Sequence, residues 1–126
     1  LGLGGAQRAA ARLDLRTLTR PIATLPATTT LTSVRAALDD GAALALVVDG
    51  PNLLGAIDAP GLAELGAVGD DVTADQVCTV LPAAAITTSL TGQDAADALK
   101  AARAVSRWLI VVDGGRMAGA VPTGAR

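Results

Sequence analysis

The sequence predicts an α/β fold built from two similar units in tandem. The main support is an internal repeat, because the runs Val47–Gly50 and Gly55–Ile57 return 64 residues later as Val111–Gly114 and Gly119–Val121. A repeat of this length is longer than most solenoid units and suits a small supersecondary module that packs on a copy of itself. The order of patterns within each copy adds to this, since an extended segment and a helical pattern precede two short apolar runs. We therefore expect two pseudo-symmetric strand-helix-strand-strand-helix units.

The first copy contains a strand, a helix and a hairpin of two strands, predicted over Pro21–Leu25, Ser33–Asp40, Leu44–Asp49 and Leu53–Ile57. Thr30 or Thr32 is suited to cap the helix, and Gly41 is suited to end it. The hairpin is predicted because Asp49–Asn52 reads Asp-Gly-Pro-Asn, a set of residues that tight turns favour.

The second copy repeats this order, with elements predicted over Ala84–Thr88, Gln93–Ala104, Trp108–Asp113 and Met117–Val121. Thr91 is a candidate helix cap, and Asp113–Arg116 supplies two glycines to the turn of the hairpin. A further helix is predicted over Ala6–Leu13. The expected organisation is a linker helix in 1–14, a first unit in 15–66, a linker in 67–76 and a second, C-terminally truncated unit in 77–126.

Composition indicates a globular segment and excludes several classes of function. The formal charge is -2, the pI is about 4.8 and the arginines are scattered, which argues against a nucleic-acid partner. Hydrophobic residues make up 51% of the chain, but many are alanine, so a thin core of Leu, Val and Ala is expected. No apolar run approaches the roughly 20 residues that span a bilayer, so we expect a soluble segment. Because the chain begins with leucine, we expect it to be a piece of a longer protein.

The residues of this chain predict no catalytic and no metal-binding site. There is no histidine, which excludes a HExxH zinc site and a Ser-His-Asp triad within the chain, and Cys78 has no histidine to activate it. The adjacent carboxylates of Asp39-Asp40 and Asp70-Asp71 are predicted to be a solvated helix end and part of a linker. Function is therefore expected to lie in binding rather than in chemistry.

Residues at the start of the first copy and at the end of both copies resemble the CBS domain, a module that occurs in pairs. The resemblance rests on the threonine-rich phrase of Thr19–Leu31 and on Val-Val-Asp followed by a glycine and two apolar residues in Val47–Ile57 and Val111–Val121. It implies a tandem CBS domain pair, association into a homodimer through helical faces, and a cleft that in many family members holds an adenine nucleotide.

The resemblance also implies candidate ligand-binding residues, which are Ala23, Thr24, Asp58, Thr88 and Thr123. In family members that bind nucleotides, a Thr or Ser and an Asp of one short phrase hold the phosphate and the ribose. Here Asp58 and Gly61 stand at these two positions in the first copy, and Pro122 and Ala125 in the second, with Thr123 one residue after the proline. An acid would repel a phosphate, so the sequence disfavours adenine nucleotide as the ligand.

A narrower resemblance connects this chain to actinobacterial site-2-protease-like intramembrane zinc metalloproteases, which carry a C-terminal CBS pair. It rests on Leu3–Leu13, Asp75–Pro82, Leu90–Asp94 and Arg107–Asp113. It implies that the chain is the regulatory tail at the cytoplasmic face of the membrane, that it docks on the membrane part of its own parent chain, and that zinc is bound upstream of residue 1. The alternatives are a free-standing CBS-type ligand sensor and an appendage of a channel or a soluble enzyme.

Overall fold

The computed structural model describes residues 12–66 and 71–125. Their elements in chain order are η1 (Leu15–Thr17), β1 (Ile22–Pro26), α2 (Leu31–Asp39), β2 (Leu44–Asp49), β3 (Asn52–Ile57), α3 (Ala59–Leu65), α4 (Ala74–Val77), η2 (Ala83–Ala85), β4 (Ile86–Thr87), α5 (Gly92–Arg103), β5 (Trp108–Asp113) and β6 (Arg116–Pro122). None of the helices within these residues is long and apolar enough to cross a membrane. Almost all of the helix predicted over Ala6–Leu13 lies outside the described residues.

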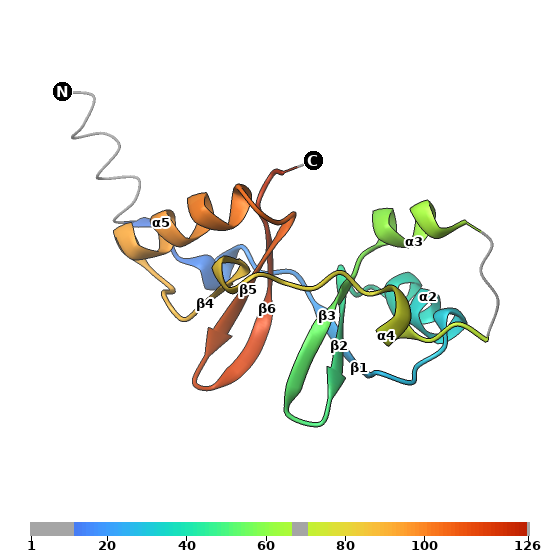
Figure 1. The fold of residues 1–126 in the computed structure, drawn as a ribbon. Coiled ribbons are helices and arrows are strands. Elements are labelled where there is room, and N and C mark those ends of the chain that lie inside the picture. The colour runs from blue at the N-terminus through green and yellow to red at the C-terminus, as the bar shows by residue number, and fades with distance from the viewer. Residues whose placement is uncertain (1–11, 67–70, 126) are drawn as a thin grey trace. The chain divides into compact units, whose positions relative to one another are not determined.

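Each copy of the repeat folds around a three-stranded mixed sheet, as Figure 1 shows. In the first sheet β1 runs parallel to β2, and β2 runs antiparallel to β3; β4, β5 and β6 repeat this arrangement. Val47 pairs with Gly55 and Val111 pairs with Gly119, and the register of each hairpin shifts directly after that pair. The predicted α/β fold with two repeated units is confirmed.

Local signals placed most elements correctly. β2 and β5 have the predicted bounds, and α2 and α5 lie within two residues of theirs. Of the two candidate caps for α2, Thr30 is the N-cap, and its Oγ1 accepts a hydrogen bond of 3.3 Å from the N–H of Ser33. Thr91 is the N-cap of α5 without such a side-chain bond. The two helices differ in length, since α5 has 12 residues and α2 has 9.

The strand predicted over Ala84–Thr88 is mostly wrong. Ala83–Ala85 forms a 3-10 turn, closed by a 2.9 Å bond from the N–H of Ala85 to the carbonyl of Pro82, and only Ile86–Thr87 pairs with β5. Alanine has a low preference for strands, and a run of three alanines after a proline is free to coil into a turn. The pairing begins at the first β-branched residue, Ile86.

The described residues form two compact units. Each unit contains a short segment that the sequence boundaries assigned to the other unit. The first-repeat unit is Pro21–Leu81, and the second-repeat unit combines 12–20 with 82–125. Residues 15–20, expected in the first unit, therefore lie in the second, and residues 77–81 lie in the first. α4, whose first residues fall in the range expected as a linker, packs against β3, and Ala74 is fully buried in the core of the first-repeat unit.

Each unit has its own core of Leu, Val, Ile and Ala. In the first-repeat unit, α2 packs on β1 and β2, and the core includes Leu31, Val34 and Val47. In the second-repeat unit, α5 packs on β5, and the core includes Leu109 and Val111. Leu15, from the segment ahead of the first copy, is fully buried in this second core.

The exchanged segments also add hydrogen bonds at the edge of each sheet. Thr79 exchanges two bonds of 2.9 and 3.0 Å with Ala56 of β3, and Arg20 exchanges two bonds of 2.8 and 3.2 Å with Ala120 of β6. Ala56 and Ala120 are equivalent residues of the repeat, so both sheets are extended at the same position. An edge strand with unpaired backbone groups gains partners in this way.

Candidate functional site

Asp58 stands where the resemblance implies a phosphate contact, but its side chain is used by the fold. It is the N-cap of α3, and its Oδ1 accepts a hydrogen bond of 2.9 Å from the N–H of Gly61. Only 5% of the residue is exposed. Aspartate is favoured at this position because its oxygen satisfies a free N–H of the first helical turn and its charge suits the positive end of the helix. Asp58 is thus a buried acidic residue whose side chain caps α3.

Two other candidate residues lie in the same unit as Asp58, on the strand at the other edge of its sheet. Ala23 of β1 pairs with Ala45, which pairs with Ile57, the residue before Asp58. Adjacent strands lie about 4.8 Å apart, so Ala23 and Ile57 are separated by about 10 Å across the sheet. Thr24 is the next residue of β1 and is exposed. The first-repeat unit therefore places Ala23 towards the same end of the sheet as Asp58, with β2 between them, and Thr24 in the middle of β1.

Thr123 is buried and has its hydroxyl fully engaged. Its Oγ1 donates a bond of 2.6 Å to the carbonyl of Ser106 and accepts one of 3.2 Å from the N–H of Ala125. Its backbone N–H donates to the carbonyl of Arg107 at 3.0 Å. These bonds tie the residues after β6 to the residues before β5, so the hydroxyl serves the fold.

Thr88 is not the structural counterpart of Thr24, although the two are 64 residues apart in the sequence. Thr24 pairs with Leu46, and the residue that pairs with the equivalent Ile110 is Ile86. Thr88 comes directly after β4 and is exposed. Thr123 comes directly after β6, at the opposite end of the sheet. The second-repeat unit therefore places Thr88 and Thr123 at opposite ends of its sheet.

The first-repeat unit has a groove between α2 and α3, which the sequence patterns did not indicate. It encloses about 290 Å³, and its walls include Leu38 and Asp39 of α2 and Leu62 and Ala63 of α3. The guanidinium of Arg35 crosses from α2 to the end of α3 and donates a bond of 3.1 Å to the carbonyl of Gly66. The groove is lined by apolar side chains together with one basic residue, Arg35, and one acidic residue, Asp39.

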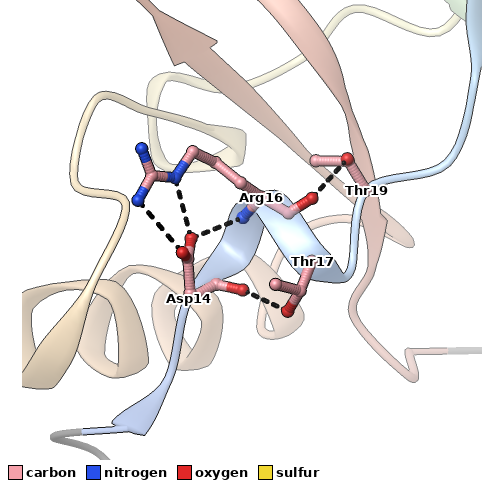
Figure 2. Close-up of polar contacts among 4 residues, drawn as sticks. All are labelled: Asp14, Arg16, Thr17 and Thr19. Atoms are coloured by element: carbon pink, nitrogen blue, oxygen red, sulfur yellow. Dashed lines mark hydrogen bonds and ion pairs between the residues drawn. The ribbon is translucent and has the colours of Figure 1, made fainter.

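The strongest described charge pair lies in the second-repeat unit, in the segment that leads into the first copy. Figure 2 shows Arg16 facing Asp14, with bonds of 3.0 Å from its Nε and its Nη2 to the two carboxylate oxygens. These hydrogen bonds hold the pKa of Asp14 below its usual range. Thr17 and Thr19 donate to backbone carbonyls of the same segment at 2.7 and 3.0 Å. These bonds fold the segment onto itself.

Acidic residues and the cysteine do not gather into a metal site within the described residues, where no three of them lie close enough to share an ion. Cys78 is half-buried at the end of α4, and burial raises the pKa of its thiol. A neutral, partly buried thiol is a poor nucleophile.

Comparison with solved structures identifies the fold. The CBS domain of a bacterial CNNM/CorC family Mg2+ transporter in complex with ATP matches 95% of this chain and 88% of its own, with a TM-score of 0.67 and 18% identity. The CBS domain of a CBS-domain-containing membrane protein from Sphaerobacter thermophilus matches 96% and 90%, with a TM-score of 0.65 and 23% identity. A putative signal-transduction protein with CBS domains from Burkholderia ambifaria matches 84% and 79%, with a TM-score of 0.57 and 22% identity.

No protein-family model matches the chain, and no curated protein sequence matches it. The structural matches nonetheless show its fold, because they extend over both repeats. The chain has the fold of a tandem CBS domain pair, and the predicted fold class is confirmed in this form.

Proposed function

We propose that this chain is a non-catalytic regulatory module of a larger membrane protein and works by binding. The observation that carries the proposal is the CBS-pair fold, which the chain shares with domains of a Mg2+ transporter and of another membrane protein. Binding of a ligand or of a partner to a module of this kind changes the populations of two states of the attached protein.

The parent that we propose is a site-2-protease-like intramembrane zinc metalloprotease, with this chain at the cytoplasmic face of the membrane. The proposal is supported by the resemblance of Leu3–Leu13 and Asp75–Pro82 to those proteins, and zinc would be bound by the part that precedes residue 1. An antibody against this chain should detect a longer product in the membrane fraction of the source cells. A product of about 12.4 kDa in the cytosolic fraction would instead support a free-standing sensor.

Adenine nucleotides are disfavoured as the ligand of the wild-type chain. The resemblance implies a phosphate contact at Asp58, whose acidic side chain is buried, and the hydroxyl of Thr123 already has both a donor and an acceptor in the fold. The loss of charge-assisted hydrogen bonds costs about 1.5–3 kcal/mol each, which moves a micromolar ligand towards the millimolar range when two are lost.

Calorimetric titration with ATP and with AMP tests this part of the proposal. The wild type should release little heat, whereas the double substitution Asp58→Thr and Gly61→Asp should raise the affinity for both nucleotides. The single substitution Gly61→Asp is the matched control, because it restores the ribose partner and keeps the acid. Low-micromolar binding of ATP to the wild type would contradict the expectation that adenine nucleotides bind weakly and would support a nucleotide sensor.

We also propose that the module acts as a homodimer. The proposal is supported by small residues of α5 that are not fully buried, Ala96, Ala98 and Ala101, which allow the close approach of a second copy. Sedimentation equilibrium should give twice the mass of the chain at micromolar concentration. A mass of 12.4 kDa at all concentrations would contradict it.

A further inference from the structure

The division of charge between the two units is much more uneven than the net charge of the chain suggests. Pro21–Leu81 contains eight acidic residues and one basic residue, Arg35, a formal charge of -7, whereas the other residues contain four acidic and nine basic ones, a formal charge of +5. The boundaries expected from the sequence hide this difference, because they assign Arg16 and Arg20 to the first unit. The second-repeat unit therefore has the charge of a protein that binds anions, although the whole chain does not.

The acidic residues of the second-repeat unit lie towards one end of it. Asp14 forms a bridge with the N-cap residue of α5, and Asp94 lies in the first turn of this helix. The carboxylate of Asp97 accepts a bond of 2.8 Å from Gln93, one turn nearer the start of α5, and Asp113 is the last residue of β5. Because α5 packs on β5 and a short turn joins the two, the start of α5 and the end of β5 lie at the same end of the unit.

The opposite end of the unit is basic. Lys100 and Arg103 lie in the last turn of α5 and are exposed, and neither forms an ion pair with another described residue. Arg107 directly precedes β5, and its carbonyl accepts a bond of 3.0 Å from the N–H of Thr123, which ties the residues after β6 to the same end. The sequence contains no Asp or Glu in 98–112 or in 114–126, so no carboxylate from these segments offsets the cations.

Exposed apolar side chains lie among these cations. Val105 is 52% exposed in the turn that joins α5 to β5, and Ala101 and Ala104 are exposed beside it. The N–H groups of Val105 and Ser106 donate to the carbonyl of Ala102 at 3.0 and 2.8 Å, so hydrogen bonds hold the turn in shape. A lipid surface offers a partner to both kinds of side chain, because its anionic headgroups attract cations and an apolar layer lies directly below them.

We propose that this end of the second-repeat unit, the basic tip formed by Lys100, Arg103, Val105 and Arg107, binds an anionic phospholipid surface. The inference rests on the proposed placement of the chain at a membrane face and adds which unit meets the lipid. The acidic first-repeat unit is repelled by such a surface, so the contact depends on the basic tip.

The strength of the contact follows from its few groups. Each Lys or Arg near an anionic membrane surface favours binding by about fivefold, and Val105 adds a small apolar side chain. The basic tip therefore binds more weakly than a single fatty acyl chain, whose association constant is about 10⁴ M⁻¹. A weak contact of this kind becomes effective when the attached protein holds the chain close to the membrane, because the effective concentration of lipid is then high.

Co-sedimentation with vesicles at millimolar lipid and low ionic strength tests the basic tip. The wild-type chain should bind vesicles that contain about 30% phosphatidylserine, should not bind vesicles of phosphatidylcholine alone, and should be released by about 0.5 M salt. The double substitution Lys100→Gln with Arg103→Gln should lower the partition about twentyfold, because it removes two cations. Val105→Ser should lower it severalfold, because it removes the exposed apolar side chain.

The control variant is Arg12→Gln with Arg116→Gln, which removes the same charge from exposed residues at the other end of the unit. It should bind the anionic vesicles like the wild type. Thermal unfolding shows separately that the variants are folded, and each substituted residue is exposed.

A wild type that fails to bind the anionic vesicles, or equal losses in the control and in the variants of the basic tip, would overturn this inference. Binding of soluble polyglutamate in place of anionic vesicles would also overturn it and would assign the basic tip to an acidic protein segment. The proposed parent is tested independently by the antibody experiment, so a longer product in the membrane fraction together with no vesicle binding would remove the lipid contact alone.

Discussion

At the scale of single residues, Gly55 and Gly119 stand at equivalent positions of the repeat, where the exchanged segments leave no room for a side chain. A Cβ on Gly55 would lie 2.5 Å from the carbonyl oxygen of Thr79 and 2.9 Å from the sulfur of Cys78. A Cβ on Gly119 would lie 2.8 Å from the Cβ of Thr19 and 3.0 Å from the carbonyl oxygen of Arg20. Any other residue would push the segment off the sheet edge.

The substitutions Gly55→Ala and Gly119→Ala should therefore both destabilise the protein, by about 1–3 kcal/mol each. The loss should be larger at Gly55, because its closest neighbour is a backbone oxygen at a shorter distance. Urea unfolding of the two variants beside the wild type measures both losses. If both variants were as stable as the wild type, the exchanged segments would not require a glycine at these two positions.

Asp58 allows its role in the fold to be separated from a role in ligand binding. Loss of the cap in Asp58→Ala should lower the free energy of unfolding by about 1 kcal/mol, whereas Asp58→Asn, which keeps the hydrogen-bond acceptor, should lose less. Urea unfolding of the pair provides the measurement. Equal losses in the two variants would show that the charge, rather than the cap, is what matters.

Cys78 gives the protein a defined response to alkaline pH. Burial raises the pKa of its thiol in the folded state, so the unfolded chain loses this proton first as the pH rises. The contribution of Cys78 to stability is complete below the pKa of the unfolded thiol and falls as the pH rises towards the folded value. Between pH 8 and pH 10 the wild type should lose more stability than Cys78→Ala in denaturant titrations, and parallel losses would contradict this assignment.

At the scale of elements, the segment ahead of the first copy is part of the second-repeat unit. Leu15 is fully buried, its N–H donates to the carbonyl of Leu90 at 2.8 Å, and the N–H of Gly92 donates to the carbonyl of Leu13 at 3.1 Å. These bonds fix the segment at the start of α5. Any protein that precedes this chain is therefore connected first to the second-repeat unit.

The substitution Leu15→Ala should consequently destabilise the second-repeat unit by about 2–5 kcal/mol. Trp108 is the only tryptophan and lies in β5, so its fluorescence reports the unfolding of this unit. Leu18→Ala is the matched control, because Leu18 is 43% exposed and its loss should change stability by less than about 0.5 kcal/mol. Similar curves for both variants would show that the segment is not anchored by Leu15.

At the scale of the whole molecule, the exchanged segments decide which part of the chain can fold alone. A fragment of residues 21–81 contains the complete first core, α4 and the bridge of Thr79 to Ala56. It should unfold cooperatively in urea by circular dichroism. A fragment of residues 15–66, the unit expected from the sequence, lacks α4 and this bridge and should not, and the reverse result would contradict the division into units.

The sequence alone determined the repeat, the α/β fold class and most of the elements. These features follow from local signals, namely Asp-Gly turns, capping threonines and runs of β-branched residues, which act within a few residues of one another. The sequence also contains no histidine, and this composition led to the expectation of a module that binds rather than catalyses.

Only the tertiary structure decided which residues meet across the chain. The pairings of Thr79 with Ala56 and of Arg20 with Ala120 join segments that no local pattern connects, and they also determine the division of charge between the units. The role of Asp58 as a cap, and the equivalence of Thr24 with Ile86 rather than Thr88, depend on where α3 begins and on the register of a two-residue strand. Such features arise from packing and hydrogen bonding over long sequence separation, and a single sequence contains no direct record of them.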